Sequence, residues 1–191
     1  MPEHHFHLRL LAGPDSDNTA DNSSTELETE GTESNTPRPD NFPLSAAGPS
    51  AARTGAVRPG ALARRHTIVA EGKPDIEGTS ARVFHGETSR WNPEELLVAA
   101  LAQCHFLSFV YLAGLAQIEI RDVEIDATGT LRVEDSGAGQ MVRVELRPRV
   151  EVPISQRDVA QALHHDAHEA CFIARSVNFE VAVIAQTISP T

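Results

Sequence analysis

The feature that most constrains the fold is an uncharged apolar stretch in the middle of the chain. After two glutamates near its start, the stretch 92–117 (NPEELLVAALAQCHFLSFVYLAGLAQ) has no charged residue. Asn92 is a good N-cap, Pro93 is tolerated in the first turn, and Asn92 with Glu95 forms a variant of the capping box. Glu94 and Glu95 also match the positive end of the helix dipole. The stretch predicts one long helix that is apolar nearly all round and therefore buried on most sides.

The composition indicates a globular domain with a tail or insert. The chain has 191 residues, of which 40% are hydrophobic, and a net charge of −11. That length and apolar content suffice for one domain with a real core. The negative charge disfavours nucleic acid and anionic membranes as partners. The start of the chain lacks the pattern of a secretory signal, and two cysteines are not a disulfide framework, so we expect a cytoplasmic protein.

The first third of the chain differs from the rest. Residues 4–11 alternate loosely between apolar and polar types, which fits either a first strand, within 1–12, or a frayed terminus. Residues 13–60 are rich in acidic, hydroxyl, Pro and Gly residues and nearly lack large apolar ones. Such a segment cannot bury enough surface to offset its ordering entropy, so it is predicted to be a disordered acidic insert. The folded domain is predicted to span 61–191.

The remaining sequence predicts an α+β domain. A strand precedes the long helix, a hairpin follows it, and a second helix capped by Ser155 leads to a last strand. In chain order these elements are expected at 61–73, 92–117, 121–133, 140–153, 156–170 and 178–186. Their order favours a largely antiparallel sheet packed on helices.

The two cysteines are the candidate reactive residues. A lone cysteine in an apolar helix, such as Cys104, is most often a small core residue. Cys171, however, follows the histidine-rich end of the second helix (HHDAHEAC). If the two thiols met across the core, they would be able to cycle between dithiol and disulfide. In such a cycle a thiolate attacks a peroxide and becomes a sulfenic acid, and a second thiol condenses with it.

A thiolate at Cys104 needs a nearby cation, because the helix dipole acts only over the first turn. An arginine from elsewhere in the chain is expected to serve, with a carboxylate to orient it. Glu94 is the candidate carboxylate, and its alternative role is simply to match the helix dipole.

Three other interpretations compete with the redox pair. The first is a zinc site, although no CxxC or HExxH pattern supports it. Its ligands would come from His164, His165, His168 and Cys171 together with Cys104 and His105. The second is a membrane span over 96–118, which is long enough but interrupted by polar residues and lacks flanking basic clusters. The third is a hydrolytic nucleophile formed by Cys104 and a histidine, for which no supporting spacing is present.

Two motifs taken together resemble the OsmC/Ohr family, the osmotically inducible protein C and organic hydroperoxide resistance proteins. The first is Asn-Pro-Glu-Glu-Leu-Leu at 92–97, with Cys104 ten residues past Glu94. The second is Ala-His-Glu-Ala-Cys at 167–171, which ends 67 residues after Cys104. The resemblance covers roughly residues 62–187. The run SRWNPEELLVAALAQCH is most similar to the OsmC-like branch found in bacteria.

The resemblance implies an OsmC-like α+β fold, an intertwined homodimer in which a mostly antiparallel sheet wraps around buried cysteine-bearing helices. It implies a thiol peroxidase that uses no metal or prosthetic group. Cys104 would be the peroxidatic cysteine and Cys171 the resolving one, and Glu94 would hold the catalytic arginine. The substrates would be organic hydroperoxides, and the reductant a dithiol such as that of a lipoylated protein.

The chain departs from the family pattern in two places. The family arginine follows the first strand in a short Gly-Arg loop, where this chain has its acidic insert; Arg53 is the best match, with Arg58 second. Phe172 follows Cys171 where many members have proline. These departures leave an alternative function open, a non-enzymatic OsmC-like dimer that binds an apolar ligand or senses oxidation. Trp91 and His105 are expected to serve local packing or to form a pocket wall.

Overall fold

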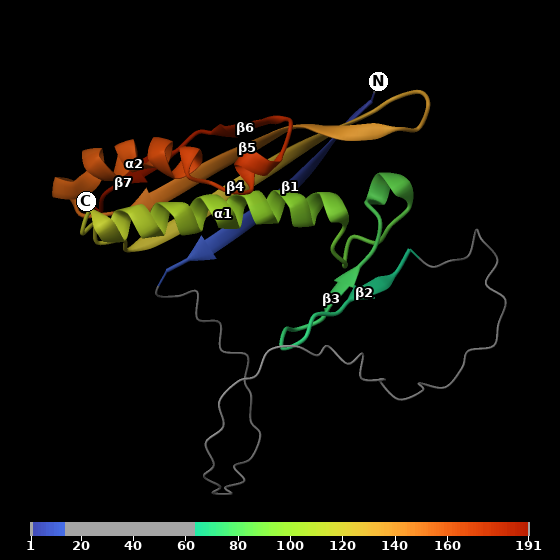
Figure 1. The fold of residues 1–191 in the computed structure, drawn as a ribbon, viewed down its shortest axis with the longest axis horizontal. Helices are drawn as coiled ribbons and strands as arrows, with labels where there is room; N and C mark the ends of the chain where they lie inside the picture. Colours follow the sequence, from blue (N-terminus) through green and yellow to red (C-terminus); the bar gives the residue numbers. More distant parts are fainter. Residues whose placement is uncertain (1, 14–63, 191) are drawn as a thin grey trace, which may run out of the picture. The chain divides into compact units, whose positions relative to one another are not determined.

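A mixed sheet and two helices form the part of the chain that carries the cysteines (Figure 1). The structure is a computed structural model that describes residues 2–13 and 64–190. Arg53, Arg58 and nearly all of the insert predicted at 13–60 lie outside the described residues. The strand order is β1-β4-β5-β6. Strand β7 also pairs with β5, farther along it than β6 does. The predicted α+β class is confirmed.

The centre of the sheet is antiparallel, as predicted. Strand β1 (Glu3–Ala12) pairs antiparallel with β4 (Asp122–Val133), which forms a hairpin with β5 (Gly139–Glu151). Of the two alternatives for residues 4–11, the structure has the strand. The alternation of apolar and polar residues in the hairpin places one face of the sheet against the helices.

The last strand predicted at 178–186 is wrong in its extent, and this edge of the sheet is parallel. The structure has two short strands there, β6 (Glu180–Val183) and β7 (Gln186–Ile188), and both run parallel to β5. The parallel direction arises because α2 (Arg157–Glu169) lies between β5 and β6 in the chain. This helix returns the chain toward the beginning of β5, so β6 runs in the same direction as β5. The break between β6 and β7 falls at Ile184, whose backbone N–H donates to the carbonyl of Leu146.

The segment before the long helix is also less regular than predicted. Within the described part of the strand expected at 61–73, only β2 (His66–Ile68) is a strand, and it pairs with β3 (Ile76–Gly78) in a separate two-stranded sheet. A single turn, η1 (Arg82–Phe84), follows β3. Trp91 is 45% exposed and bridges to Gly78, so it belongs to this segment.

The long helix α1 (Pro93–Leu115) begins where the sequence predicts. The Asn92 side chain accepts a hydrogen bond from the Glu95 backbone N–H at 2.8 Å, and the Glu95 carboxylate accepts one from the Asn92 N–H at 3.3 Å. This reciprocal pair is the predicted capping box. The second helix differs at its start, because a turn, η2 (Ile154–Gln156), precedes it and Ser155 makes no capping bond.

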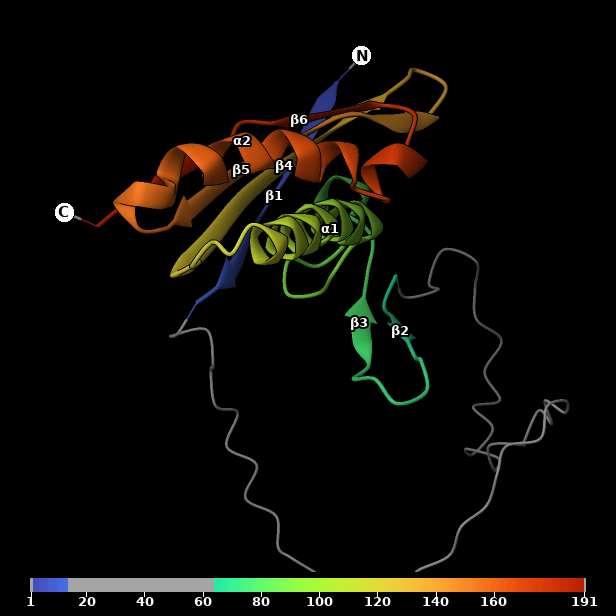
Figure 2. The ribbon, with the colours of Figure 1, turned by 60° about the vertical axis from the view of Figure 1, so that its left-hand side comes forward.

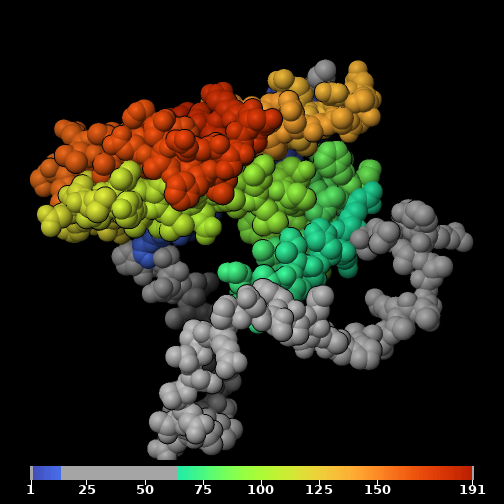
Figure 3. Space-filling view, in the orientation of Figure 1, coloured from blue at the N-terminus to red at the C-terminus, as the bar shows by residue number. Residues whose placement is uncertain are grey.

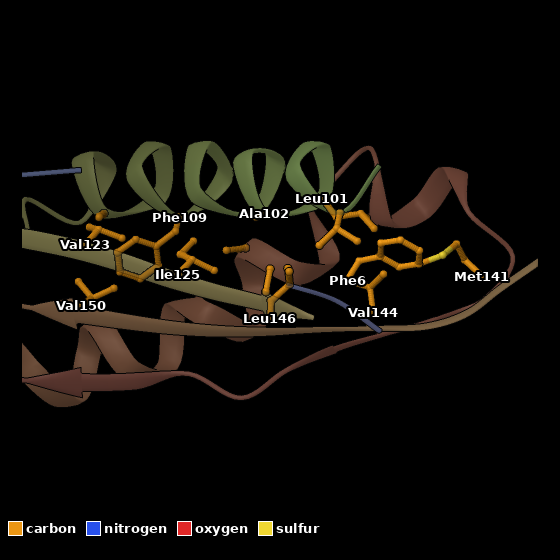
Figure 4. Close-up of a cluster of buried hydrophobic side chains, with 14 of the residues drawn as sticks. Phe6, Leu101, Ala102, Phe109, Val123, Ile125, Met141, Val144, Leu146 and Val150 are labelled. Atoms are coloured by element: carbon orange, nitrogen blue, oxygen red, sulfur yellow. The ribbon is translucent and has the colours of Figure 1, made fainter. Parts of the chain in front are cut away.

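Both helices contact the sheet and each other (Figure 2). Between α1 and the sheet lie apolar side chains from α1, β1, β4 and β5 (Figure 4). Gly129 of β4 allows the close approach of α1, since a Cβ there would come within 2.5 Å of Val98 and 2.6 Å of Met141. The sheet therefore fixes the position of α1, and with it that of Cys104.

The prediction that α1 is buried on most sides is wrong for the single chain. Only one stripe of the helix is buried, from Val98 to Ala113. On the other side Leu107 is 57% exposed, and Tyr111 and Leu115 are each 67% exposed. By length and composition alone α1 is able to cross a membrane, but one side of it packs on the sheet as a core helix does. Beyond Glu95 the helix has no charged side chain, and one chain by itself buries only this stripe of it.

Candidate thiol site

The two cysteines lie beside each other, although 67 residues separate them. Cys104 is half-buried in the middle of α1, and Cys171 follows the end of α2 with 1% of its surface exposed. Both are free thiols in contact with each other. The backbone N–H of Ile173 also donates to the Cys104 sulfur at 3.5 Å. The site thus joins the centre of one helix to the C-terminal end of the other.

The environment of Cys171 favours its protonated form. The pKa of the Cys171 thiol is raised to about 11, chiefly by burial and in smaller part by the neighbouring Cys104 thiol. At neutral pH Cys171 is therefore a thiol rather than a thiolate, and a buried one. Cys104 is the more accessible of the two, and an N–H dipole points at its sulfur.

Cys104 opens into a pocket of about 930 Å³. Its walls are mostly apolar and come from one side of α1 and from the segment after α2. The apolar part includes Ala100, Leu107, Tyr111, Leu112, Phe172 and Ile173. The space-filling view shows α1, in yellow-green, meeting the segment after α2, in orange-red, along one surface (Figure 3). A pocket of this size and lining suits an organic molecule better than a small polar one.

Glu94 is not part of this pocket. It lies ten residues before Cys104 on the same helix, which corresponds to about 15 Å along the helix axis. Its Oε2 atom is buried and has no hydrogen-bond partner within the described ranges. The arginine it was expected to hold, Arg53, lies outside those ranges. The structure therefore brings Cys104 and Cys171 together but leaves Glu94 apart from them.

His105, next to Cys104 in the chain, is buried in the contact between α1 and α2. Its ring stacks on that of His164 with an angle of 10° between the planes, and His164 stacks on Phe109 at 4.3 Å. The His105 Nε2 and His164 Nδ1 atoms are 3.3 Å apart. Burial lowers the pKa of His105 to about 4 and that of His164 to about 3, so both are neutral at physiological pH. Of the roles expected for His105, the structure supports packing.

The histidines and cysteines do not form the zinc site considered above. Among residues 2–13 and 64–190, no three Cys, His, Asp or Glu side chains are arranged to hold a metal ion. His164 and His105 are occupied with each other, and Cys171 faces Cys104.

Sequence reasoning missed the contribution of the segment after Cys171. Phe172 and Ile173 line the pocket, and Arg175 stands at it as a charged group. The only signal in the sequence was that these residues follow Cys171 directly, so they have to lie close to its thiol.

The comparisons with known proteins agree with this architecture. The family model described as OsmC-like protein matches residues 85–185. An OsmC-like protein of unknown function from Vibrio cholerae is 31% identical, with a TM-score of 0.58 over 65% of this chain and 85% of that one. No curated protein matches the chain.

Two more distant structures show the same fold. An organic hydroperoxide resistance protein from Elizabethkingia anophelis is 19% identical, with a TM-score of 0.53 over 65% of this chain and 90% of that one. An OsmC-like protein from Mycoplasma pneumoniae is 13% identical, with a TM-score of 0.54 over 69% of this chain and 92% of that one. The family model spans more than half of the chain and includes both cysteines. The chain therefore belongs to the OsmC-like family.

Proposed function

We propose that the protein is a thiol-dependent peroxidase that reduces organic hydroperoxides through Cys104 and Cys171. The observation that carries the proposal is the contact of these two thiols at the edge of a largely apolar pocket. The organic hydroperoxide resistance proteins among the structures of the same fold agree with it. The protein is expected to act in the cytoplasm.

The first step of the proposed reaction takes place at Cys104. Its thiolate attacks the terminal oxygen of the hydroperoxide, the O–O bond breaks, and the alkoxide leaves as an alcohol after taking up a proton. Cys104 becomes a sulfenic acid. The Ile173 N–H, 3.5 Å from the sulfur, favours negative charge there. The apolar walls favour an alkyl peroxide over hydrogen peroxide because they bury its hydrocarbon part.

The second step uses the buried neighbour. The Cys171 thiol gives up its proton as its sulfur attacks the Cys104 sulfenic sulfur, the S–O bond breaks, and water leaves as the disulfide forms. A raised pKa keeps Cys171 from competing for peroxide beforehand. An external dithiol, such as that of a lipoylated protein, then exchanges with the disulfide and restores both thiols, itself becoming oxidised.

The proposal includes a homodimer, which two separate observations support. The exposed apolar side of α1 needs a cover, and Glu94 has a buried carboxylate oxygen without a partner in the described part of the chain. Glu94 and Cys104 of one chain are too far apart to share an arginine. In a dimer whose α1 helices pack together, Glu94 of one chain would serve Cys104 of the other, with Arg53 as the candidate cation.

The second candidate function is a non-enzymatic dimer that binds an apolar ligand or senses oxidation. The departure from the family pattern favours it, because the acidic insert stands where the family has its arginine, and without an arginine the first step would be slow.

Intact mass spectrometry after one equivalent of cumene hydroperoxide tests the proposed chemistry. The wild-type protein should lose the mass of two hydrogen atoms and both titratable thiols. Cys171→Ser should gain one oxygen, as a sulfenic acid that dimedone traps, and Cys104→Ser should stay unmodified. Oxidation of Cys104→Ser as fast as the wild type would overturn the assignment of roles.

A further inference from the structure

A pair of buried histidines joins α1 to α2 beside the thiol site. His105, which follows Cys104 in α1, has 1% of its surface exposed, and His164 of α2 has 4% exposed. The His105 Nε2 and His164 Nδ1 atoms are 3.3 Å apart, so one of these nitrogens donates a hydrogen bond that the other accepts. The pair therefore fixes the distance between the two helices one residue after Cys104.

His164 also packs on a second ring of α1. Its imidazole stacks on Phe109 with 4.3 Å between the ring centroids. Phe109 lies about one helical turn after His105, and both side chains are buried on the same side of α1. A ring held by two neighbours one turn apart is not free to slide along the helix. The two contacts thus fix the position of α2 along α1 as well as its distance.

His164 is the largest side chain on the face of α2 that leads to Cys171. The buried residues of α2 are Ala160, His164 and Ala167, and Cys171 follows at the spacing of the same helical face. The backbone N–H of Cys171 donates to the carbonyl of His168 at 3.1 Å, which keeps the cysteine on the last turn of the helix. Because the buried neighbours of His164 are alanines, the position of this face against α1 depends on His164, and Cys171 moves with the face.

The two thiols tolerate little displacement of the helices. A disulfide needs its two Cα atoms at a separation of about 4.4–6.8 Å. One helical turn is about 5.4 Å along the axis, so a slip of α2 by a single turn would carry Cys171 out of reach of Cys104. The observed contact of the thiols therefore requires that the two helices be held to within a fraction of a turn.

We propose that His105 and His164 are positioning residues that keep the sulfurs of Cys104 and Cys171 in contact. They act through the position of α2 on α1 rather than on the reacting atoms. In the proposed reaction, this contact lets the disulfide form, with loss of water, before a second hydroperoxide transfers an oxygen atom to the Cys104 sulfenic acid and gives the sulfinic acid. That consequence rests on the proposed function, whereas the positioning of the thiols does not.

The equilibrium of the thiol pair with glutathione measures the positioning without any peroxide. One oxidised glutathione converts the reduced full-length protein to its Cys104–Cys171 disulfide and becomes two reduced glutathione molecules. The better the two thiols are held together, the larger is the equilibrium constant for this exchange. His164→Ala should lower the constant by about fivefold or more, because it removes both the hydrogen bond and the stacked ring. His105→Ala should lower it in the same direction.

Conservative variants show which nitrogen matters. An asparagine amide lies near the place of a histidine Nδ1, and a glutamine amide lies near that of Nε2. His164→Asn and His105→Gln should therefore keep the bond and bring the constant to within about threefold of the wild type. His164→Gln has a similar volume but places its amide away from His105, so it should behave as His164→Ala does. It replaces His164→Ala if that variant does not fold, as judged by circular dichroism.

Leu146→Ala is the matched control. It removes a buried side chain from the core between α1 and the sheet (Figure 4), so it should lower the free energy of unfolding while leaving the glutathione constant within about twofold of the wild type. An equal loss in Leu146→Ala would show that the constant follows overall stability, and would overturn the proposal. A wild-type constant in folded His164→Ala or His164→Gln would overturn it too.

The two proposals fail separately. If the glutathione constant depends on His164 but peroxide leaves both thiols intact, the peroxidase assignment falls and the positioning role stands. If cumene hydroperoxide forms the disulfide, and His164→Ala changes neither the glutathione constant nor the share of Cys104 sulfinic acid formed in excess peroxide, the positioning role falls and the peroxidase stands.

Discussion

At the scale of single residues, the two thiols differ in their access to solvent. Cys171 has 1% of its surface exposed, and burial raises its pKa to about 11. Cys104 is half-buried and lines an open pocket. In the proposed reaction, this difference would let Cys104 meet the peroxide first and leave Cys171 for the second step.

Alkylation measures this difference directly. In the reduced protein at neutral pH, iodoacetamide should label Cys104 at least about tenfold faster than Cys171, since only the thiolate reacts and a pKa near 11 leaves almost none. Peptide mass mapping over time provides both rates. Equal rates, or faster labelling of Cys171, would contradict the environments described for the two residues.

The sequence was sufficient to find the cysteines but not the charged group beside them. Cys104 and Cys171 stand out because they are the only two cysteines and because their motifs resemble a family. Arg175 is one arginine among fifteen in the sequence. Arg175 lies at the pocket because of the direction the chain takes after α2, and no local sequence pattern predicts that direction.

At the scale of elements, α1 and the sheet depend on a glycine for their close approach. Replacing Gly129 with alanine places a Cβ 2.5 Å from Val98 and 2.6 Å from Met141. We expect the substitution to lower the free energy of unfolding by about 1–3 kcal/mol, as overpacking does. Urea unfolding followed by circular dichroism measures the change.

Gly114→Ala is the matched control for Gly129→Ala, because a Cβ at this helical glycine has no atom within 4 Å. It should raise the stability by up to about 1 kcal/mol through helix propensity. An unchanged or increased stability in Gly129→Ala would show that the helix and the sheet are not as closely packed as described.

The contact between α1 and α2 should make stability depend on pH. Burial lowers the folded-state pKa of His105 to about 4 and that of His164 to about 3. Below the unfolded-state pKa of about 6.5, the unfolded chain binds protons that the folded chain does not. Their contribution to stability is therefore complete above about pH 6.5 and is lost as the pH falls toward the folded-state values, by at most about 1.4 kcal/mol per pH unit for each histidine.

The variant His164→Phe isolates this contribution. Urea midpoints measured on either side of the ordinary histidine pKa should differ less in the variant than in the wild type. His5→Gln is the control, because His5 lies on the exposed face of β1. A pH dependence that His164→Phe leaves unchanged would exclude the buried pair as its source.

The elements differ in how well the sequence specifies them. The capping box and uncharged run define α1, and strict alternation defines β4 and β5, because these signals are local. The split between β6 and β7 and their parallel pairing are set by the return path through α2, which no short pattern contains. The start of α2 was predicted to within one residue, but its cap was not, because Ser155 belongs to the turn η2 that precedes the helix.

At the scale of the whole molecule, the single chain leaves a large apolar surface exposed. Leu107, Tyr111 and Leu115 of α1 and Phe172 after α2 are each more than half exposed. The apolar pattern alone predicts burial for the helix but does not record how many chains assemble; only the family resemblance implies a cover, the second chain of an intertwined homodimer. A dimer would account for the uncharged character of both sides of α1.

Sedimentation velocity tests this assembly. The wild type should sediment as a dimer, and Leu107→Lys should shift it to a monomer, because a buried charge without a partner costs several kcal/mol. Ile154→Lys is the matched control, since Ile154 is 69% exposed in η2 and does not line the Cys104 pocket. A monomeric wild type would remove the support that the exposed apolar surface gives to a dimer.

The most direct test of the central claim is stopped-flow oxidation of the reduced protein by cumene hydroperoxide and by hydrogen peroxide, with thiol loss and disulfide mass followed in one experiment. We predict rapid formation of a Cys104–Cys171 disulfide, a faster reaction with the organic peroxide because of the apolar pocket, and slower oxidation in Arg53→Ala. Slow oxidation at the same rate by both peroxides would contradict the peroxidase assignment and favour a binding or sensing protein with the same fold.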